Sequence, residues 1–168
     1  MNFAIRPEGP EDAASIRAVL TTAFPTSAEA DLVEQLRRDS DIEIAIVAED
    51  DARIVGHIVM SRMQVKGDGR SFRTLGLAPL AVQPERQHGG IGSRLIREAL
   101  AIARGNGEEL VFVLGAPAYY GRFGFSTTTA APFTSPYAGP HLMALSLVEL
   151  DLPAQGRADY APAFAAFE

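Results

Sequence analysis

A strand, a glycine-rich turn and a helix follow one another without a break between Val82 and Ile96. Gly89, Gly90 and Gly92 stand within four positions of this stretch. Glycine allows positive φ angles and a close approach of the backbone to a ligand, and the following helix directs its first N–H groups and the positive end of its dipole toward the turn. The stretch therefore predicts an α/β chain with an anion-binding turn that needs no lysine.

The spacing within this stretch excludes two common phosphate-binding loops. The turn does not end in Gly-Lys-Ser/Thr, which excludes a Walker-type nucleotide loop. A dinucleotide-binding turn would open directly from the strand and carry a small residue where Leu95 stands, but residues 83–86 intervene here. From these residues alone, an ordinary glycine-rich helix start is as good an interpretation as a phosphate loop.

Length and composition limit the classes of protein to which the chain can belong. A chain of 168 residues suits one domain with its own core, so we expect a single domain over residues 1–168. The absence of a long apolar run and of a charged-then-apolar leader favours a cytoplasmic protein with no membrane partner. Zero cysteines and three scattered histidines predict no metal site, and a net charge of −6 argues against a nucleic-acid partner.

The spacing of apolar residues predicts the order of the elements. Helices are expected from Pro10 to before Pro25, from Thr26 onward, and over 90–104. The second helix is expected to begin with a capping box, Thr26 to Glu29, and to carry an exposed Glu34–Arg38 pair. Strands are expected over 3–6, 42–48, 54–65, 72–82, 110–114 and 142–147.

Connections between these elements follow from the turn residues. Two short turns, 50–53 and 66–70, predict three consecutive antiparallel strands, and the helix over 90–104 predicts a crossover to a parallel strand. Pro79 cannot donate to a ladder, so its strand is an edge, contains a bulge or opens from its neighbour, and from the sequence alone an edge is the commoner case. Residues 132–140 are expected to form a loop, and the irregular tail after 147 to cover a sheet edge or to serve a homodimer.

Two motifs together resemble one enzyme family. Gln87-x-x-Gly90-x-Gly92 resembles the pyrophosphate loop of the GNAT family, the Gcn5-related N-acetyltransferases. Tyr120, followed by Gly124-Phe125, resembles the second recurrent stretch of that family; without the upstream loop, tyrosines beside glycines would be packing residues. The wider pattern around Leu75–Pro84, Leu114–Phe125 and Gly156–Phe164 is similar to the YhbS-like subgroup of predicted acetyltransferases, over most of residues 3–167.

The resemblance implies a fold, a co-substrate and a set of site residues. The GNAT fold is a mixed, mostly antiparallel central sheet, splayed between the strands ending near Val82 and Leu114 and flanked by helices. Acetyl-CoA would be the co-substrate, without a metal, and Tyr120 would give a proton to the departing CoA thiolate. The cofactor-binding residues would be Leu80, Ala81 and Val82 along pantetheine, and Gln87, His88, Gly89, Gly90, Ile91, Gly92 and Ser93 at the pyrophosphate.

The reaction implied is transfer of an acetyl group to an amine. With no cysteine and no recognisable serine-histidine-acid triad, we expect direct attack by a primary amine, on a small molecule or a protein, in a ternary complex. No general base is assigned, because the titratable candidates Glu43, Glu49, His57 and His141 each have an ordinary structural explanation and many family members use a water. The alternative is a catalytically silent acyl-CoA-binding or sensing module, against which the tyrosine and the intact loop argue.

Overall fold

The computed structural model describes residues 2–167 and divides them into two compact units. The first unit holds the residues up to 60, residues 79–102 and those from 162 onward; the second holds residues 61–78 and 103–161. Three elements run through both units along the chain: β3 (Arg53–Gly67), β4 (Arg70–Val82) and α3 (Ile91–Gly105). The expectation of a single domain stays a prediction.

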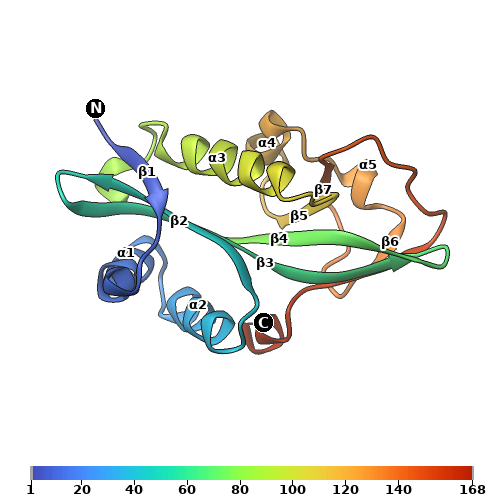
Figure 1. Ribbon diagram of the computed structural model, residues 1–168, viewed down its shortest axis with the longest axis horizontal. Helices are drawn as coiled ribbons and strands as arrows, with labels where there is room; N and C mark the ends of the chain where they lie inside the picture. Colours follow the sequence, from blue (N-terminus) through green and yellow to red (C-terminus); the bar gives the residue numbers. More distant parts are fainter. Residues whose placement is uncertain (1, 168) are drawn as a thin grey trace. The chain divides into compact units, whose positions relative to one another are not determined.

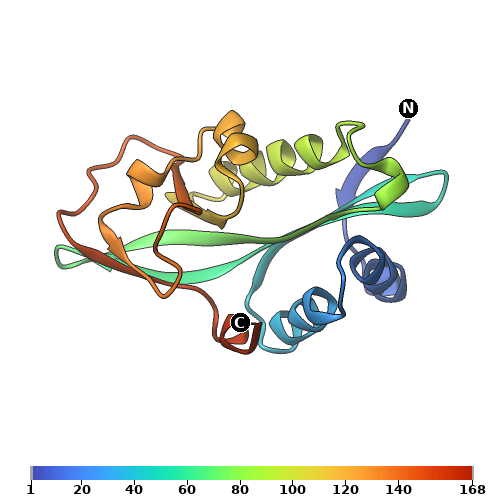
Figure 2. The same ribbon diagram turned by 180° about the vertical axis from the view of Figure 1, so that it is seen from behind.

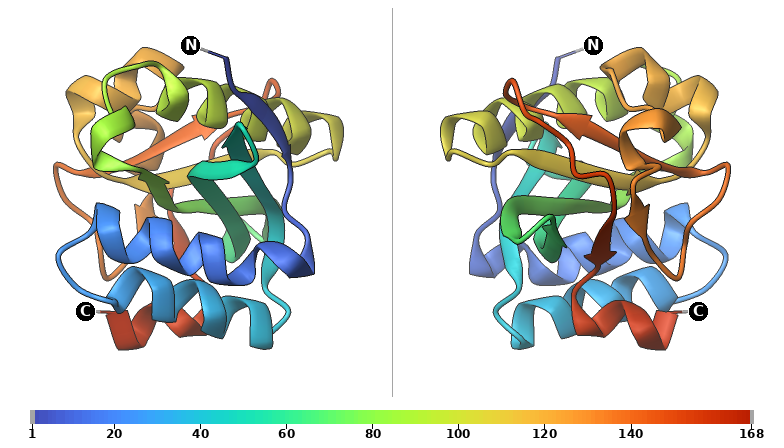
Figure 3. Two further views of the ribbon diagram at one scale, coloured as in Figure 1. Left: turned by 90° about the vertical axis from the view of Figure 1, so that its left-hand side faces the viewer. Right: turned by 90° about the vertical axis from the view of Figure 1, so that its right-hand side faces the viewer.

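The first unit is a layered α/β assembly. Its remaining elements are β1 (Ala4–Pro7), η1 (Pro10–Asp12), α1 (Ala13–Ala23), α2 (Ala28–Arg38), β2 (Ile42–Asp50) and the C-terminal turn of helix η4 (Pro162–Phe167). β1 pairs with β2 antiparallel, from Ala4 opposite Glu49 to Pro7 opposite Ile46. Helices α1 and α2 cover one face of these strands with η4 beside α2, and α3 covers the other face (Figures 1 and 3).

Gly56 explains how α3 comes close to the first unit's strands. A Cβ at this position of β3 would lie 2.9 Å from Cγ2 of Ile91 and 3.0 Å from Cδ1 of Leu95. Both side chains belong to the first turns of α3 and are completely buried. The missing side chain at residue 56 therefore makes room for the beginning of the helix that the sequence singled out.

Two hairpin turns have the geometry that the sequence predicts. Asp51 and Ala52, between β2 and β3, have φ angles of 51° and 65°. Asp68 and Gly69, between β3 and β4, have φ angles of 50° and 80°. Two consecutive left-handed residues form the two-residue turn that matches the twist of the flanking strands.

The second unit is built around β5. β5 (Leu110–Leu114) pairs parallel with β4 and antiparallel with β7 (Leu142–Ser146). β6 (Phe133–Thr134) pairs parallel with β8 (Gly156–Asp159), which pairs antiparallel with β3, and Figure 2 shows β6 and β8 beside the end of the β3–β4 hairpin. The short helical elements are α4 (Pro117–Tyr120), η3 (Gly121–Phe123) and α5 (Thr127–Ala130).

The parallel ladder between β4 and β5 is short. It runs from Thr74 opposite Leu110 to Leu77 opposite Val113, whereas β4 continues as a strand through Pro79 to Val82. The ladder thus ends before the proline, which has no N–H to donate. The expected α/β fold, an open and mostly antiparallel sheet flanked by helices, is confirmed.

Several local expectations are wrong. Ser27, not Thr26, is the N-cap residue of α2, and Thr26 instead accepts a hydrogen bond from the amide of Ala28 (3.2 Å). Glu34 of α2 pairs with Arg17 of α1 (2.9 Å), because the two helices pack together. Arg38 instead donates to Gln35 (2.8 Å).

The C-terminal third differs most from the expectation. The predicted loop over 132–140 contains β6, and the predicted last strand is followed by β8. Both strands are short: β8 pairs with β3, about ninety residues earlier in the chain, and β6 pairs with β8. The tail covers the edge of β3, as one of the two alternatives for it predicted.

Candidate functional site

The glycine-rich turn is an exposed loop that ends at the first residue of α3. His88 and Gly90 have left-handed φ angles of 65° and 89°, and a Cβ at Gly90 would meet no described atom within 4 Å. The amide of Arg94 donates to the carbonyl of Gly90 (3.0 Å), so Gly90 precedes the first helical residue. The amides of Ile91 and Gly92 consequently lie in the first turn, where a helix offers no acceptor of its own. This arrangement suits an anion.

Hydrogen bonds on both sides fix the loop to the first unit. Arg86 donates to the carboxylate of Asp50 at the end of β2 (2.7 Å). The amide of Gln83 donates to the carbonyl of Val55 (2.9 Å), and the side chain of Gln87 donates to the carbonyl of Val82 (3.1 Å). The loop is therefore held at its base, while Gln87, His88, Gly89 and Gly90 remain exposed.

The predicted cofactor-binding residues all belong to the first unit. Leu80, Ala81 and Val82 form the last part of β4, with Ala81 buried and its two neighbours half-buried. Ile91 is buried, and Gly92 and Ser93 are half-buried in the first turn of α3. The hydrogen bond from Gln87 to Val82 joins the end of the strand to the loop. Tyr120, the predicted acid, belongs to the second unit.

Aromatic packing and one glycine hold the ring of Tyr120. Tyr120 ends α4, and its ring meets those of Tyr119 and Phe125 edge-on, with centroids 5.0 and 6.0 Å apart. A Cβ at Gly115 would lie 2.5 Å from Cε2 of the Tyr120 ring. The ring thus rests directly on the backbone of Gly115, which is a contact that the sequence analysis missed. A glycine five residues before the tyrosine was the available signal.

The phenol of Tyr120 keeps its proton at neutral pH. Burial raises its pKa to about 12, and the nearby Tyr119 adds to the rise. Burial disfavours the charged phenolate because it removes the water that would solvate it. Tyr120 is therefore a neutral hydrogen-bond donor and not a base.

The other titratable candidates have structural roles or stand exposed. His57 is fully buried in β3, and its Nε2 lies 2.8 Å from the Glu8 carboxylate. Glu49 accepts a hydrogen bond from Arg6 (2.9 Å), whereas Glu43 and His141 are exposed. Within the described residues 2–167, no group of three or more His, Cys, Asp or Glu side chains is placed to hold a metal.

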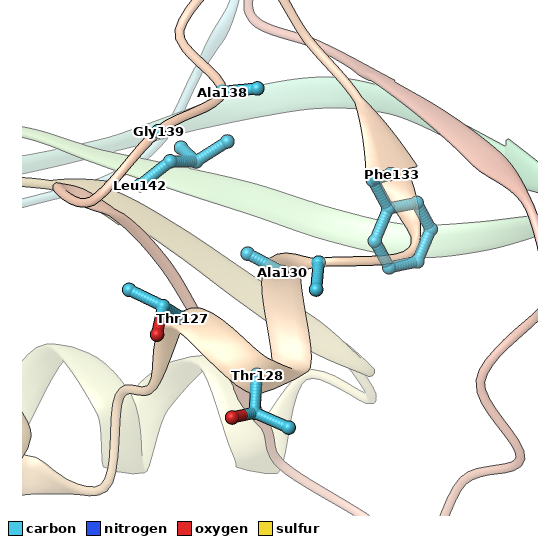
Figure 4. A pocket seen from close by; sticks show the side chains of 8 residues that line it. Thr127, Thr128, Ala130, Phe133, Ala138, Gly139 and Leu142 are labelled. Atoms are coloured by element: carbon cyan, nitrogen blue, oxygen red, sulfur yellow. The ribbon is translucent and has the colours of Figure 1, made fainter.

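The second unit also contains a small hollow beside α5, with a volume of about 440 Å³ (Figure 4). Thr127 and Thr128 contribute hydroxyl groups, and the rest of the lining is apolar or backbone. None of its lining residues is titratable, so this hollow offers no acid or base chemistry.

No helix in the part of the chain that the structure describes combines the length and the apolar character needed to cross a bilayer.

Sequence comparison identifies close relatives. The chain is 42% identical over 132 residues to the uncharacterized N-acetyltransferase YjhQ of Escherichia coli K12, which covers 77% of this chain and 73% of that protein. It is 38% identical over 122 residues to the uncharacterized N-acetyltransferase YhbS of the same strain, covering 72% of each.

Solved structures agree with the sequences. The crystal structure of E. coli YhbS in complex with CoA matches with a TM-score of 0.86 at 30% identity, covering 98% of this chain and 93% of that one. A GNAT acetyltransferase from Brucella melitensis in complex with acetyl-CoA matches with a TM-score of 0.82 at 36% identity, covering 97% and 98%.

The family pattern of the acetyltransferase (GNAT) domain matches residues 4–128, a span that contains the loop, the start of α3 and Tyr120. Together with relatives of around 40% identity, this match confirms the resemblance seen in the two motifs. The chain belongs to the GNAT family of acetyltransferases, in its YhbS-like group.

Proposed function

We propose that the chain is an acetyl-CoA-dependent N-acetyltransferase whose pyrophosphate site is the loop from Gln87 to Ser93. The observation that carries this proposal is the position of Gly90, a left-handed residue directly before α3, above which the space for a side chain is open. A pyrophosphate there would meet the first-turn amides of α3 and the positive end of its dipole. That two relatives were crystallised with CoA and acetyl-CoA supports the choice of ligand.

Pantetheine would run along the last part of β4, over Leu80, Ala81 and Val82. The parallel ladder with β5 ends at Leu77, so the strand continues for five residues beyond it. Backbone groups of an extended strand match the amides of pantetheine in the way that a neighbouring strand would. The same N–H groups are suited to polarise the thioester carbonyl, since a fixed dipole needs no reorganisation during the reaction.

Tyr120 would donate its phenolic hydrogen to the departing sulfur. In the balanced reaction, the neutral amine attacks the thioester carbon, the C–S bond breaks, and the amine's proton is lost as the sulfur gains one. With a pKa of about 12, the phenol donates less readily than an acid matched to neutral pH. Its contribution is therefore hydrogen bonding to the developing thiolate, with proton transfer completed late.

The acceptor would be a primary amine, on a small molecule or a protein, that attacks in a ternary complex. The chain has no cysteine to carry the acetyl group, which supports direct transfer. Two of the candidate bases are already hydrogen-bonded: His57 is buried and lies within hydrogen-bond distance of Glu8, and Glu49 accepts from Arg6. A water molecule would then take the amine's proton.

Calorimetry with acetyl-CoA and the Gly92→Glu variant tests the site. A carboxylate at the second helical position would place negative charge where the pyrophosphate is expected, and glutamate is well tolerated in a first helical turn. We expect at least a hundredfold weaker binding with an unchanged circular dichroism spectrum. Equal binding by the two proteins would overturn the site assignment.

An amine panel with detection of free CoA tests the reaction itself. Release of CoA that depends on both acetyl-CoA and an amine supports the enzyme. Tight binding of acetyl-CoA without turnover on any amine class would instead support a silent acyl-CoA-binding module. Trapping of an acetylated protein in the absence of acceptor would contradict the ternary complex.

A further inference from the structure

A row of polar side chains crosses the outer face of the second unit where β8 lies between β3 and β6. Lys66 of β3 stands directly opposite Arg157 of β8, and Arg157 stands opposite Thr134 of β6. On the other side of Lys66, the two-residue turn at 68–69 brings Ser71 of β4 opposite it. Residues in one cross-strand row point to the same face of a sheet, and all four are exposed here.

Two like charges therefore face each other in neighbouring positions of an antiparallel ladder. Directly opposite residues have Cβ atoms about 4.5–5.5 Å apart, and like charges at this distance destabilise the pair. Lys66 is the only lysine among the fifteen basic residues of the chain. Within the described residues, its ammonium group forms no ion pair, whereas Arg157 is paired with Asp159.

Arg157 forms an ion pair that leaves some of its N–H donors unused. Its Nε and Nη2 donate to the two carboxylate oxygens of Asp159 (2.8 and 2.9 Å). This bidentate pair fixes the plane of the guanidinium and leaves the hydrogens of Nη1 for another acceptor. Arg70, at the rim, is engaged by Glu109 (2.6 Å) and stacks 4.2 Å above the Phe72 ring.

A hollow of about 770 Å³ lies over this row. Its lining contains three basic side chains and no acidic one, together with neutral hydrogen-bonding groups. The lining residues that matter here are Lys66, Arg70, Ser71, Thr134, Gln155 and Arg157. An anion between the two central cations would be attracted to both of them and would offset their mutual repulsion.

We propose that this hollow is a phosphate-binding site, with the phosphate between the ammonium of Lys66 and Nη1 of Arg157. A phosphate group carries about 1.5 to 2 negative charges at neutral pH and has strong acceptor oxygens, which matches two neighbouring cations. The site is made of second-unit residues alone and shares none with the proposed acetyl-CoA loop.

Because the chain has a single lysine, a lysine label reports on this site alone. Protein labelled with ¹³C-lysine gives one side-chain Cε resonance, which belongs to Lys66. We expect inorganic phosphate to shift it saturably in the millimolar range, while chloride at equal ionic strength gives a small, linear change. A non-saturating response to phosphate, equal to that of chloride, would overturn the proposal.

Matched variants separate a site from general charge. Arg157→Gln should weaken phosphate binding at least tenfold, whereas Arg53→Gln, an exposed arginine at the start of the same strand β3, should leave it unchanged. Circular dichroism checks that both variants fold. Equal affinities in wild type and Arg157→Gln would contradict the site. Tighter binding of glycerol phosphate than of inorganic phosphate would identify a phosphate ester as the ligand, and equal binding would identify free phosphate.

Discussion

Tyr120 and Gly115 form one contact at the scale of single residues. The ring lies where a Cβ of residue 115 would be, so the position of the phenol depends on the absence of one methyl group. A proton donor acts only when its oxygen is within hydrogen-bond reach of the departing atom. If Tyr120 is the donor, Gly115 positions it.

Tyr120→Phe removes the phenolic oxygen and keeps the ring. We expect turnover to fall about tenfold to ten-thousandfold, toward the lower end because a pKa of about 12 limits proton donation. The dissociation constant of acetyl-CoA and the thermal midpoint should stay close to wild type. Tyr119→Phe is the control and should retain most of the activity. Full-rate transfer by Tyr120→Phe, with chemistry rate-limiting, would assign the residue to packing alone.

Gly115→Ala should lower turnover because the added methyl displaces the Tyr120 ring. Gly121→Ala is the matched control, since a Cβ there meets no described atom within 4 Å. The decisive measurement is a double-mutant cycle with Tyr120→Phe. If Gly115 acts through the phenol, Gly115→Ala costs little further turnover once that oxygen is gone. Equal losses in both backgrounds would show a general structural effect.

Asp12 is a second residue whose environment predicts a measurable effect. Hydrogen bonds from Arg6 and from the amide of Gly9 lower the pKa of this buried carboxylate to about 2. Its folded pKa lies below its unfolded one, so the carboxylate stabilises the fold above about pH 4 and loses this effect as the pH falls toward 2.

We therefore expect Asp12→Asn to lower the free energy of unfolding by about 1–2 kcal/mol at pH 7. The difference from wild type should shrink as the pH falls from 4 toward 2. Urea unfolding at several pH values measures it, with Asp151→Asn, an exposed position, as the control. A difference that is independent of pH would contradict the assignment.

At the scale of elements, the two hairpins of the sheet differ in one turn residue. Both turns contain two left-handed residues, but the first is Asp51-Ala52 and the second Asp68-Gly69. A left-handed conformation costs an alanine roughly 1 kcal/mol, whereas glycine adopts it freely. The first hairpin therefore carries strain that the second avoids.

Exchanging these residues should have opposite effects. We expect Gly69→Ala to destabilise the fold by about 1 kcal/mol, because a methyl at residue 69 meets no described atom and only the backbone strain remains. Ala52→Gly should stabilise by somewhat less, since glycine gains entropy in the unfolded chain. Chemical denaturation measures both, and changes of the same sign would refute the strain argument.

Elements encoded by neighbouring residues were predictable, and those that depend on distant partners were not. The hairpin turns and the beginning of α3 depend on a few consecutive residues, and the structure agrees with them. The pairing of β8 with β3 joins residues that are far apart in the sequence, and neither strand's own pattern specifies the other. Glu34 likewise forms its ion pair with Arg17 of α1 and not with a residue of its own helix.

The same distinction applies to the candidate site. The loop over 87–93 is contiguous and carries its signal in its glycines. The contact between Gly115 and Tyr120 spans a short helix, so the motif suggested the tyrosine but not its support. The opposition of Lys66 and Arg157 becomes visible only when the register of β3 and β8 is known.

At the scale of the whole molecule, the two units are not separate segments of chain. The elements β3, β4 and α3 each have residues in both units. If one unit unfolded alone, each of these three elements would be only partly formed. Interrupted strands and helices lose cooperativity. We expect one calorimetric unfolding transition, with equal calorimetric and van't Hoff enthalpies; two resolved transitions would show independent units.

Because Lys66 is the only lysine of the chain, a lysine-specific protease can cleave the chain at one position. An endoproteinase that cleaves only after lysine has a single target, the bond between Lys66 and Gly67, and that bond lies in the ladder between β3 and β8. A protease needs an extended, unpaired segment, so each cut requires β3 to separate here from both β8 and β4. When opening and closing are fast, the cleavage rate measures the free energy of that local opening. The digest would contain two fragments, and their rate of appearance would give the stability of this end of the β3–β4 hairpin and its β8 neighbour without any label.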